Sequence, residues 1–259
     1  MMTLNEQLTK KGALLGFCLM YPAPGIIERI GRDWDWMWID AQHGQFNYNT
    51  ILECVRVCEC AGIPSVVRVP SHDYGNIGYA LDACTCGVMV PMVNTAEQAR
   101  AIVQAAKFPP LGLRSYGGRR PIDIYGRSYS HMANEDVLLI AQIETLEGLK
   151  NAEEIASVPG IDALFFGPDD MAMQLSMPMD QPRKFNFFKS ELEKIAAAAQ
   201  KAGKIAGTVT GSAEMLELAM QMGYQLCVGT GDVGLLAGGS KRIKDILSQV
   251  VSQISKTNE

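Results

Sequence analysis

The sequence predicts a (β/α)8 TIM barrel that occupies residues 1–259 as a single domain, and three observations lead to this fold class. Eight short apolar runs recur along the chain, segments with helical spacing lie between them, and 259 residues is a typical length for one such barrel. The runs are continuously apolar, as expected of parallel strands that are buried on both faces. A doubly wound open sheet is the alternative, but no G-x-G-x-x-G motif follows the first run and no linker divides the chain.

The apolar runs give the order of the elements. The helical segments between them often begin at Ser or Thr, carry Glu near the third position and end at Gly, as in 95–107, 190–203 and 212–223. Strand and helix therefore alternate, which is the repeating unit of the barrel. The predicted strands are residues 13–20, 34–40, 64–70, 87–93, 137–144, 162–168, 204–210 and 224–231.

Two segments depart from this alternation. Residues 114–134 contain several Gly and Arg residues, and their polarity predicts a long irregular connection before the fifth strand. Residues 241–256 carry apolar side chains on one face, which predicts an amphipathic helix. This face must be buried against the barrel or, at a subunit interface, against a neighbouring copy. Its apolar residues are Ile243, Ile246, Leu247, Val250, Val251 and Ile254.

The composition favours a cytoplasmic globular protein. Hydrophobic residues make up 47% of the chain and charged residues 20%, which is sufficient for a large core. The net charge of −5 gives no support to a nucleic-acid partner, and no apolar run approaches the ~20 residues that span a bilayer, so no membrane partner is expected. The N-terminus lacks the order of a signal peptide, and seven cysteines fit reduced thiols better than paired disulfides.

Polar side chains at the ends of several predicted strands indicate the position of a site. In a TIM barrel, functional side chains lie at the carboxyl ends of the strands. Asp40 and His43 follow the second strand, and Arg68 ends the third. Glu144 ends the fifth strand, and Asp170 follows the sixth. These groups should therefore converge on one rim of the barrel.

Glu144 and Asp170 predict a divalent cation at this rim. Two carboxylates on neighbouring strand ends repel each other unless a positive charge lies between them or one of them holds a proton. Carboxylate ligands without His or Cys favour Mg²⁺ or Mn²⁺, with Co²⁺ as a further candidate. The alternative is that each carboxylate forms a salt bridge or, for Asp170, caps a helix.

Arg68 and His43 extend the predicted site. A buried guanidinium at Arg68 needs a partner, which is either a substrate oxygen or else Asp40 or Glu144. His43 is suited to proton transfer near neutral pH if Asp40 fixes its tautomer, whereas a surface or core histidine is the alternative. A Schiff base needs a lysine at the carboxyl end of a strand, whereas five lysines fall in predicted helices or before strands, which argues against this chemistry. They are Lys107, Lys150, Lys194, Lys201 and Lys204.

Several motifs in the same order resemble those of a known family. They are DAQHGQFN, VVRVP, ALDACTCGVMVPMVNTAEQAR followed by PPLGLRSYG, AQIET with its EGLKN continuation, and ALFFGPDDMA. With these motifs the chain resembles the HpcH/HpaI aldolase/citrate lyase family of class II, metal-dependent pyruvate aldolases, to which 4-hydroxy-2-oxo-heptanedioate aldolase belongs. The resemblance runs from the first strand to the last helix.

The resemblance assigns roles to individual residues. Glu144 in AQIET and Asp170 in GPDDM match the metal ligands, and Arg68 matches the arginine that binds the keto or enolate oxygen. His43 matches the catalytic histidine. Asp40 and Asp82 match the acids that orient this histidine, and Gln142 matches a polar residue beside the metal. The turn that holds the pyruvate carboxylate is matched by Gly167, Pro168 and Asp169.

The resemblance also implies an activity. It implies reversible cleavage of a 4-hydroxy-2-oxo acid to pyruvate, or a close 2-oxo acid, and an aldehyde through a metal-bound enolate. It further implies a homo-oligomer, a hexamer or trimer of dimers, in which the terminal helix is exchanged between subunits. The alternatives are an oxaloacetate decarboxylase or acyl-CoA hydroxy-acid lyase on the same scaffold, or a barrel that binds a 2-oxo acid without turnover.

Two further features concern rate and substrate. Gln42 stands where the family usually has Glu, and the loss of this charge should change proton transfer at the neighbouring His43. Four arginines of the long connection could bind an acidic or polyhydroxylated aldehyde, or they could form a solvated basic loop. They are Arg114, Arg119, Arg120 and Arg127.

Overall fold

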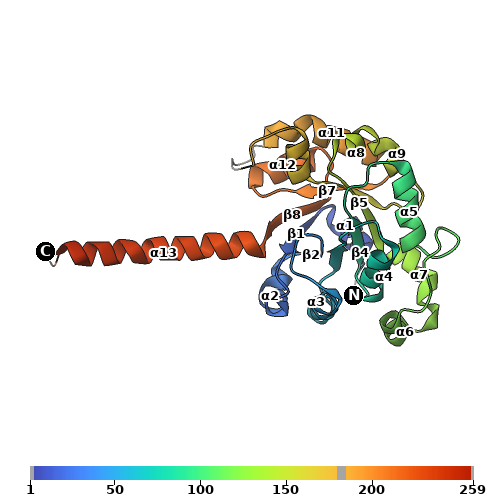
Figure 1. The fold of residues 1–259 in the computed structure, drawn as a ribbon, viewed down its shortest axis with the longest axis horizontal. Helices are drawn as coiled ribbons and strands as arrows, with labels where there is room; N and C mark the ends of the chain where they lie inside the picture. Colours follow the sequence, from blue (N-terminus) through green and yellow to red (C-terminus); the bar gives the residue numbers. More distant parts are fainter. Residues whose placement is uncertain (1–2, 180–184, 258–259) are drawn as a thin grey trace.

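The computed structural model describes residues 3–179 and 185–257 and contains a closed barrel of eight parallel strands, so the predicted (β/α)8 fold is confirmed (Figure 1). The strands follow one another around the barrel in sequence order, and β8 pairs with β1 to close it. Every predicted apolar run contains one strand. The strands are β1 Leu14–Leu19, β2 Trp36–Asp40, β3 Ser65–Arg68, β4 Gly87–Val90, β5 Leu138–Ile143, β6 Ala163–Phe166, β7 Ile205–Val209 and β8 Leu226–Gly231.

Helices surround the barrel, and the three predicted from their caps are present as α5, α11 and α12. The Thr95 side chain accepts a hydrogen bond from the Gln98 N–H at the start of α5, and Gly203 in the left-handed region ends α11. The helices are α1 Leu4–Lys11, α2 Pro24–Ile30, α3 Tyr48–Ala61, α4 Tyr74–Asp82, α5 Ala96–Ala106, α6 Arg119–Tyr125, α7 Ser130–Asp136, α8 Leu146–Lys150, α9 Ala152–Ala156, α10 Pro168–Gln174, α11 Lys189–Ala202, α12 Ala213–Gln221 and α13 Asp232–Thr257, with short 3-10 turns η1 Gly31–Asp33, η2 Arg127–Tyr129 and η3 Phe185–Phe188.

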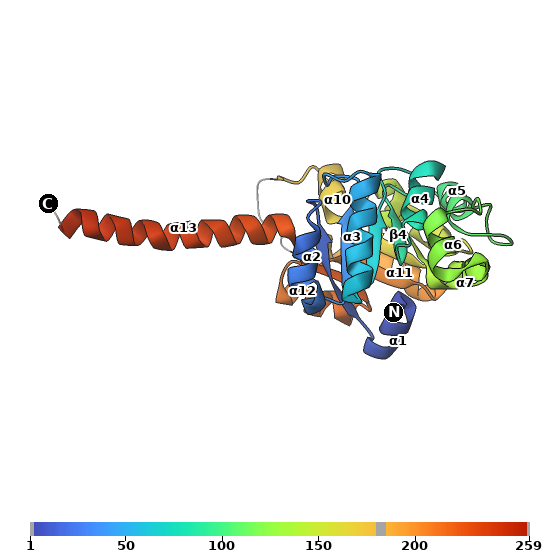
Figure 2. The same cartoon turned by 90° about the horizontal axis from the view of Figure 1, so that it is seen from below.

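The hydrophobic core has two layers, one between strands and helices and one inside the barrel. Helix α1 contributes Leu4 and Leu8 to the inner layer, and Figure 2 shows α1 and α10 at opposite ends of the barrel. Helix α1 therefore covers the amino-terminal end of the strands, while the carboxyl-terminal end is left for polar groups. The inner layer also contains Leu14, Trp36, Trp38, Val66, Met89, Leu138, Ile140, Ala163, Phe165, Leu226 and Val228.

The connection 114–134 is more ordered than its composition predicts. It contains α6, η2 and the start of α7, and the side chains of Arg114 and Tyr129 are buried. The prediction of an irregular connection is therefore wrong, because most of the segment forms helical turns, although most of its residues lie outside the core as their polarity predicts. Arg114 is an exception, since aromatic rings cover its guanidinium. Its carbon Cζ lies 4.7 Å from the ring centroid of Phe108 and 6.0 Å from that of Tyr129.

The C-terminal amphipathic helix is longer than predicted and does not pack on its own barrel. Helix α13 begins at Asp232, directly after β8, and projects away from the barrel (Figure 1). The buried Asp232 carboxylate accepts hydrogen bonds from the N–H groups of Met20 and Tyr21, which fixes the start of the helix beside β1. Within the described part of the chain, no helix is both long and apolar enough to cross a bilayer.

Candidate active site

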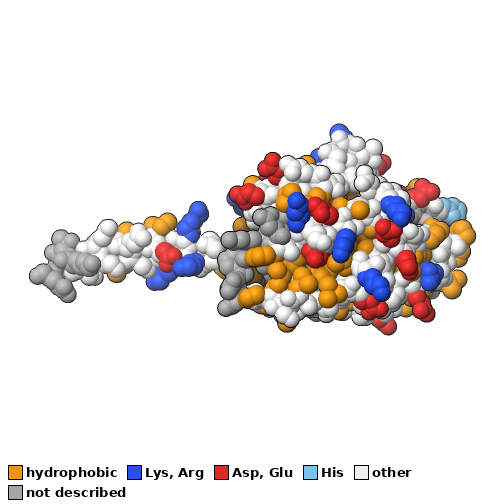
Figure 3. Space-filling model, turned by 90° about the horizontal axis from the view of Figure 1, so that it is seen from above, with side chains coloured by type: hydrophobic (Ala, Val, Ile, Leu, Met, Phe, Trp, Pro, Cys, Tyr) orange, Lys and Arg blue, Asp and Glu red, His pale blue; other side chains and the backbone are white. Residues whose placement is uncertain are grey.

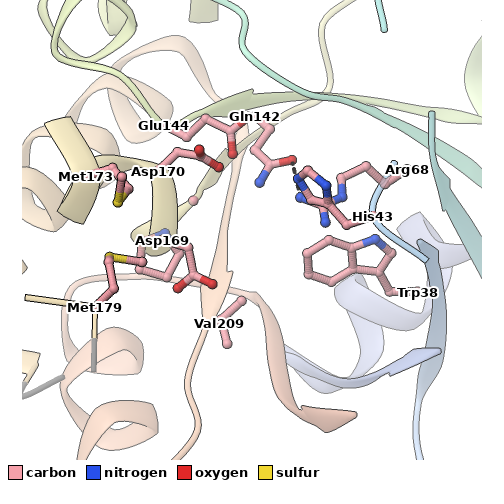
Figure 4. Close-up of a pocket in the computed structure, with 12 residues that line it drawn as sticks. Trp38, His43, Arg68, Gln142, Glu144, Asp169, Asp170, Met173, Met179 and Val209 are labelled. Carbon is pink, nitrogen blue, oxygen red and sulfur yellow. Dashed lines mark hydrogen bonds between the residues drawn. The ribbon is translucent and has the colours of Figure 1, made fainter. Parts of the chain in front are cut away.

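A cavity of about 300 Å³ lies at the carboxyl ends of the strands, where the sequence places its polar residues. Figure 4 shows side chains from several strands and from α10 pointing into it. Of the predicted site residues, eight line the cavity, and Asp40 lies directly behind one of them. The lining residues are Trp38, His43, Arg68, Gln142, Glu144, Gly167, Pro168, Asp169, Asp170, Met173, Met179 and Val209.

Glu144 is the buried acid of the cavity. It follows β5 and is 1% exposed, and its Oε1 accepts a hydrogen bond of 2.8 Å from the N–H of Met92. Met92 has a φ of 56°, a left-handed conformation that is uncommon for a residue with a side chain and is often found at functional sites. Burial raises the pKa of Glu144 to about 7; the Met92 N–H opposes this shift and the charge of Asp170 adds to it.

Asp170 faces Glu144 from the first turn of α10. The carboxylates of the two residues point toward one another (Figure 4). The chain can bring them together because Gly167 stands between β6 and α10: a Cβ there would lie 2.5 Å from Glu144 Oε2 and 2.9 Å from Gln142 Nε2. The glycine is therefore required by close approach, and any side chain at this position would displace Glu144 or Gln142.

Arg68 and Asp40 form a buried ion pair beside this acidic pair. Their strands are paired so that the two residues lie opposite each other, and their side chains are 9% and 1% exposed. Arg68 Nε donates to Asp40 Oδ1 at 2.8 Å and Nη2 donates to Oδ2 at 2.6 Å. Nη1 lies 3.5 Å from Gln142 Oε1, a long contact, so this nitrogen remains available toward the cavity.

His43 lies on the opposite side of the cavity from Asp169 (Figure 4) and is exposed at the mouth. The Asp40 carboxylate accepts from the backbone N–H of His43 at 3.3 Å and of Gln42 at 3.1 Å. The predicted contact between Asp40 and the imidazole is thus replaced by a contact with the backbone, because the carboxylate oxygens are engaged by Arg68. Gln42 Oε1 is buried and has no hydrogen-bond partner in residues 3–179 and 185–257.

Asp82 lies away from the cavity. It is the last residue of α4, which runs back from the rim toward the amino-terminal ends of the strands. Its Oδ1 accepts a hydrogen bond of 3.1 Å from Arg114 Nη2. Within one chain Asp82 is therefore engaged by Arg114, and its role in orienting His43 stays a prediction.

The connection arginines also lie outside the lining of the cavity. Arg114 is engaged by Asp82, Arg119 by Asp123, and Arg120 by Glu59. The interpretation of this segment as an aldehyde-binding loop of the same chain is not supported, because three of its cations have intrachain partners.

Four lining residues were not among the predicted site residues. Trp38 could have been found, since it precedes Asp40 by two positions on one strand and therefore faces the same side. Met173 lies three residues after Asp170 on a helix, which also places the two on one face. Val209 and Met179 carry no comparable signal, because an apolar residue at a strand end or in a loop resembles many others.

The acidic pair fits a hard divalent cation. The two carboxylates face each other in the cavity, and the raised pKa of Glu144, caused mainly by burial, shows that the site disfavours the charge of Glu144 when no cation balances it. Among the residues that the structure describes, no cluster of three or more His, Cys, Asp or Glu is placed to hold a metal. The chain would thus contribute Glu144 and Asp170, and water and substrate oxygens would supply the other ligands.

Fold and site together define the class: a TIM-barrel protein with two facing carboxylates and a buried guanidinium at the carboxyl-terminal rim of the barrel. The family model of HpcH/HpaI aldolase/citrate lyase matches residues 24–237 of this chain. The chain therefore belongs to the HpcH/HpaI aldolase/citrate lyase family, and it is a carbon-carbon lyase.

Individual relatives agree with this assignment. The chain is 45% identical over 161 residues to 4-hydroxy-2-oxovalerate aldolase of Novosphingobium aromaticivorans, covering 61% of this chain and 62% of the relative. It is 33% identical over 233 residues to hydroxypyruvate/pyruvate aldolase of Rhizorhabdus wittichii, covering 89% and 92%. Its fold matches that of a family protein from Burkholderia cenocepacia with a TM-score of 0.85 and 28% identity, covering 95% of this chain and 100% of the other.

Proposed function

We propose that this chain catalyses the reversible aldol cleavage of a 4-hydroxy-2-oxo acid to pyruvate, or a close 2-oxo acid, and an aldehyde, and that it depends on Mg²⁺, Mn²⁺ or Co²⁺. The observation that carries the proposal is the pair of facing carboxylates, Glu144 and Asp170, next to the buried Arg68 in one cavity. Relatives named for 4-hydroxy-2-oxovalerate and for hydroxypyruvate and pyruvate support this substrate class.

Glu144 and Asp170 hold the cation in this proposal. The cation, when bound, supplies a Lewis acid that withdraws electron density from the keto group as the carbon-carbon bond breaks. The backbone of the Gly167–Asp169 turn, which opens α10, binds the substrate carboxylate, and Gln142 lies beside it. These groups fix the 2-oxo acid with its keto oxygen directed toward Arg68.

Arg68 stabilises the negative charge that develops on the keto oxygen. Asp40 accepts from Nε and from one N–H of Nη2, so the N–H groups of Nη1 and the second N–H of Nη2 are the donors left, and we assign Nη1 to the substrate because its contact with Gln142 is long. The Arg68 side chain is 9% exposed, so water competes little for this interaction, and preorganised donors in such an environment stabilise an oxyanion strongly.

His43 transfers the proton of the C4 hydroxyl group. It is exposed and lines the cavity opposite Asp169 of the turn assigned to the carboxylate, so we place the aldehyde half of the substrate next to it. In cleavage it removes this proton, and in synthesis it returns the proton to the new alkoxide. The turn that carries it is tight: Gly44 N–H donates to Asp40 O at 3.1 Å, and a Cβ on Gly44 would lie 2.2 Å from that oxygen.

The test is the exchange of the C3 protons of pyruvate in D₂O, followed by NMR. Metal-stripped protein is compared before and after addition of Mg²⁺, Mn²⁺ or Co²⁺. Exchange requires no aldehyde, because the enolate forms from pyruvate alone. We expect this exchange to depend on the cation. A folded protein that binds pyruvate but exchanges no proton with any of the three cations would contradict the proposal.

We further propose that the protein acts in the cytoplasm as a homo-oligomer, a hexamer or trimer of dimers. All seven cysteines are free thiols, which fits a reducing compartment. The apolar face of α13 is exposed, with Ile243 55%, Leu247 58% and Val251 65% exposed, which is unfavourable for a helix that stays in water. Figure 3 shows hydrophobic side chains gathered on the barrel beside the start of this helix, and a second copy could cover both surfaces.

The mass of the protein in solution tests this assembly. Light scattering of the full chain should give a multiple of the subunit mass. Replacement of Leu247 and Val251 by Asp should lower that mass, whereas replacement of the exposed Lys244 by Asp should leave it unchanged. A full-length chain that is monomeric at micromolar concentration would contradict the assembly.

A further inference from the structure

We infer that Trp38 is a positioning residue of the active site: its indole face holds the Arg68 guanidinium in the orientation in which Nη1 meets the substrate oxygen. The inference rests on the proposed function, because it assigns a role toward a substrate oxyanion. Trp38 lies on β2 two residues before Asp40, so both side chains point into the barrel. It lines the same cavity as Arg68.

The Arg68 guanidinium is held from two directions. Asp40 binds two of its nitrogens in the plane of the group, at 2.8 Å and 2.6 Å. Trp38 covers one face, with the Arg68 Cζ 4.7 Å from the centroid of its ring. The carboxylate therefore restricts movement within the plane, and the ring restricts movement out of the plane. The edge formed by Nη1 and the second N–H of Nη2 is left, and there Nη1 donates to Gln142 Oε1 over a long 3.5 Å.

The indole itself is fixed from the far side of the barrel. Phe165 on β6 meets it edge to face, with ring centroids 5.5 Å apart and an angle of 71° between the planes. Phe165 is fully buried, and Gly207 makes room for it, since a Cβ there would lie 2.6 Å from Phe165 Cδ2. Trp38 is 5% exposed, so it cannot turn away from the guanidinium without displacing this packing.

The ring acts through its face. The negative face of an indole attracts a cation, and this attraction is strongest where water is excluded. The indole N–H makes no hydrogen bond within residues 3–179 and 185–257, so a ring without this group should serve almost as well. Phe at position 38 should therefore still hold the Arg68 guanidinium through its ring face. Leu should fill part of the space but offer no ring face to the guanidinium.

The chain offers a matched control one layer lower. Trp36 is on the same strand, points into the same barrel and is fully buried, and its indole N–H is also without a partner among the described residues. It differs in position, because it does not line the cavity. Replacement of Trp36 by Phe therefore measures what the loss of an indole inside this barrel does to folding alone.

The experiment compares Trp38→Leu, Trp38→Phe and Trp36→Phe by pyruvate C3 proton exchange, with kcat and KM measured separately. We expect Trp38→Leu to lower kcat roughly ten-fold with little change in KM, because an oriented guanidinium matters most as charge develops. Trp38→Phe should stay within about three-fold of the unmodified protein, and Trp36→Phe should lower only the melting temperature.

A double-mutant cycle tests whether Trp38 acts through Arg68. In an Arg68→Gln background the indole has no cation to hold, so Trp38→Leu should cause little further loss of kcat. An equal fold-change in both backgrounds would overturn the inference, and so would equal effects of Trp38→Leu and Trp36→Phe on kcat.

Crystal structures of the variants give a readout that does not depend on activity. The Arg68 guanidinium should be displaced or disordered in Trp38→Leu and unchanged in Trp36→Phe. An unchanged guanidinium in Trp38→Leu would overturn the inference. Absence of metal-dependent exchange in the unmodified protein would instead contradict the proposed function, and these structures would still decide whether Trp38 positions Arg68.

Discussion

The inner face of the barrel has two regions that are equally buried and chemically opposite. In the lower layers β2, β3 and β5 point Trp36, Val66 and Leu138 inward, each no more than 1% exposed. At the carboxyl ends the same strands lead to Asp40, Arg68 and Glu144, which are 1%, 8% and 1% exposed. The lower layers stabilise the fold by removing apolar surface from water. The upper layer carries buried charges, which are costly unless they are paired, so its residues are explained by chemistry and not by stability.

Replacement of Glu144 by Gln is the strongest test of this difference. It removes one of the two carboxylates, so pyruvate exchange should fall by at least about 10³-fold and the affinity for the cation should fall with it. The free energy of unfolding should stay the same or rise, because a buried charge is removed. Exchange kinetics, calorimetric titration with Mn²⁺ and thermal melting measure the three quantities.

The matched control for this change is Glu147→Gln. Glu147 is exposed on α8, three residues along the chain, and should alter none of the three quantities. A Glu144→Gln protein that keeps its cation affinity would remove Glu144 from the metal site.

Replacement of His43 by Ala should separate proton transfer from cation binding. We expect aldol cleavage to slow by about 10²-fold or more, the usual contribution of one acid-base group, while the affinity for the cation is nearly unchanged. His131→Ala on the exposed surface of α7 is the matched control. Turnover that is the same in both variants would count against the role of His43.

Replacement of Leu138 by Ala should have the reverse pattern. Leu138 is 1% exposed in the lower layer, and its truncation should lower the free energy of unfolding by about 2–5 kcal/mol through lost burial and a cavity. Cation affinity and exchange rate at a temperature well below the melting point should change little. Loss of cation affinity in a folded Leu138→Ala protein would show that the two layers are not separate in function.

The pH dependence of the free energy of unfolding should show that the upper layer disfavours the charge of Glu144. Burial raises the pKa of Glu144 from an ordinary value of 4.5 to about 7, so the folded state holds this proton more tightly than the unfolded state. This tighter proton binding contributes to the free energy of unfolding. The contribution is complete below about pH 4.5 and is lost as the pH rises through 7. Metal-free protein should therefore lose this contribution between about pH 4.5 and pH 7.

The cation should reverse the effect, since it stabilises the ionised carboxylates. Mg²⁺ should raise the melting temperature by a few degrees more at pH 8 than at pH 6, measured by scanning calorimetry. The Glu144→Gln protein should lose this difference. An equal effect of Mg²⁺ at both values of pH would contradict the assignment of the raised pKa to the cation site.

Much of the fold and of the site could be predicted from the sequence. The eight apolar runs predicted the strands, because a parallel barrel buries both faces of each strand. Each strand must therefore be apolar along its own length, and this is visible in each run by itself. The strand ends then indicated Arg68, Glu144, Asp170 and His43, since the carboxyl ends of parallel strands share one rim. These inferences needed only local pattern and the handedness of the fold.

Only the tertiary structure decided which polar groups meet. Asp40 pairs with Arg68 and not with the imidazole of His43, because strand register sets β2 and β3 side by side at these residues. Asp82, the last residue of α4, pairs with Arg114, which lies 32 positions further along the chain. The covering of Arg68 by Trp38 depends on strand register and on packing across the barrel from Phe165. Such contacts join residues far apart in the chain, so their distances are set by packing and not by sequence spacing.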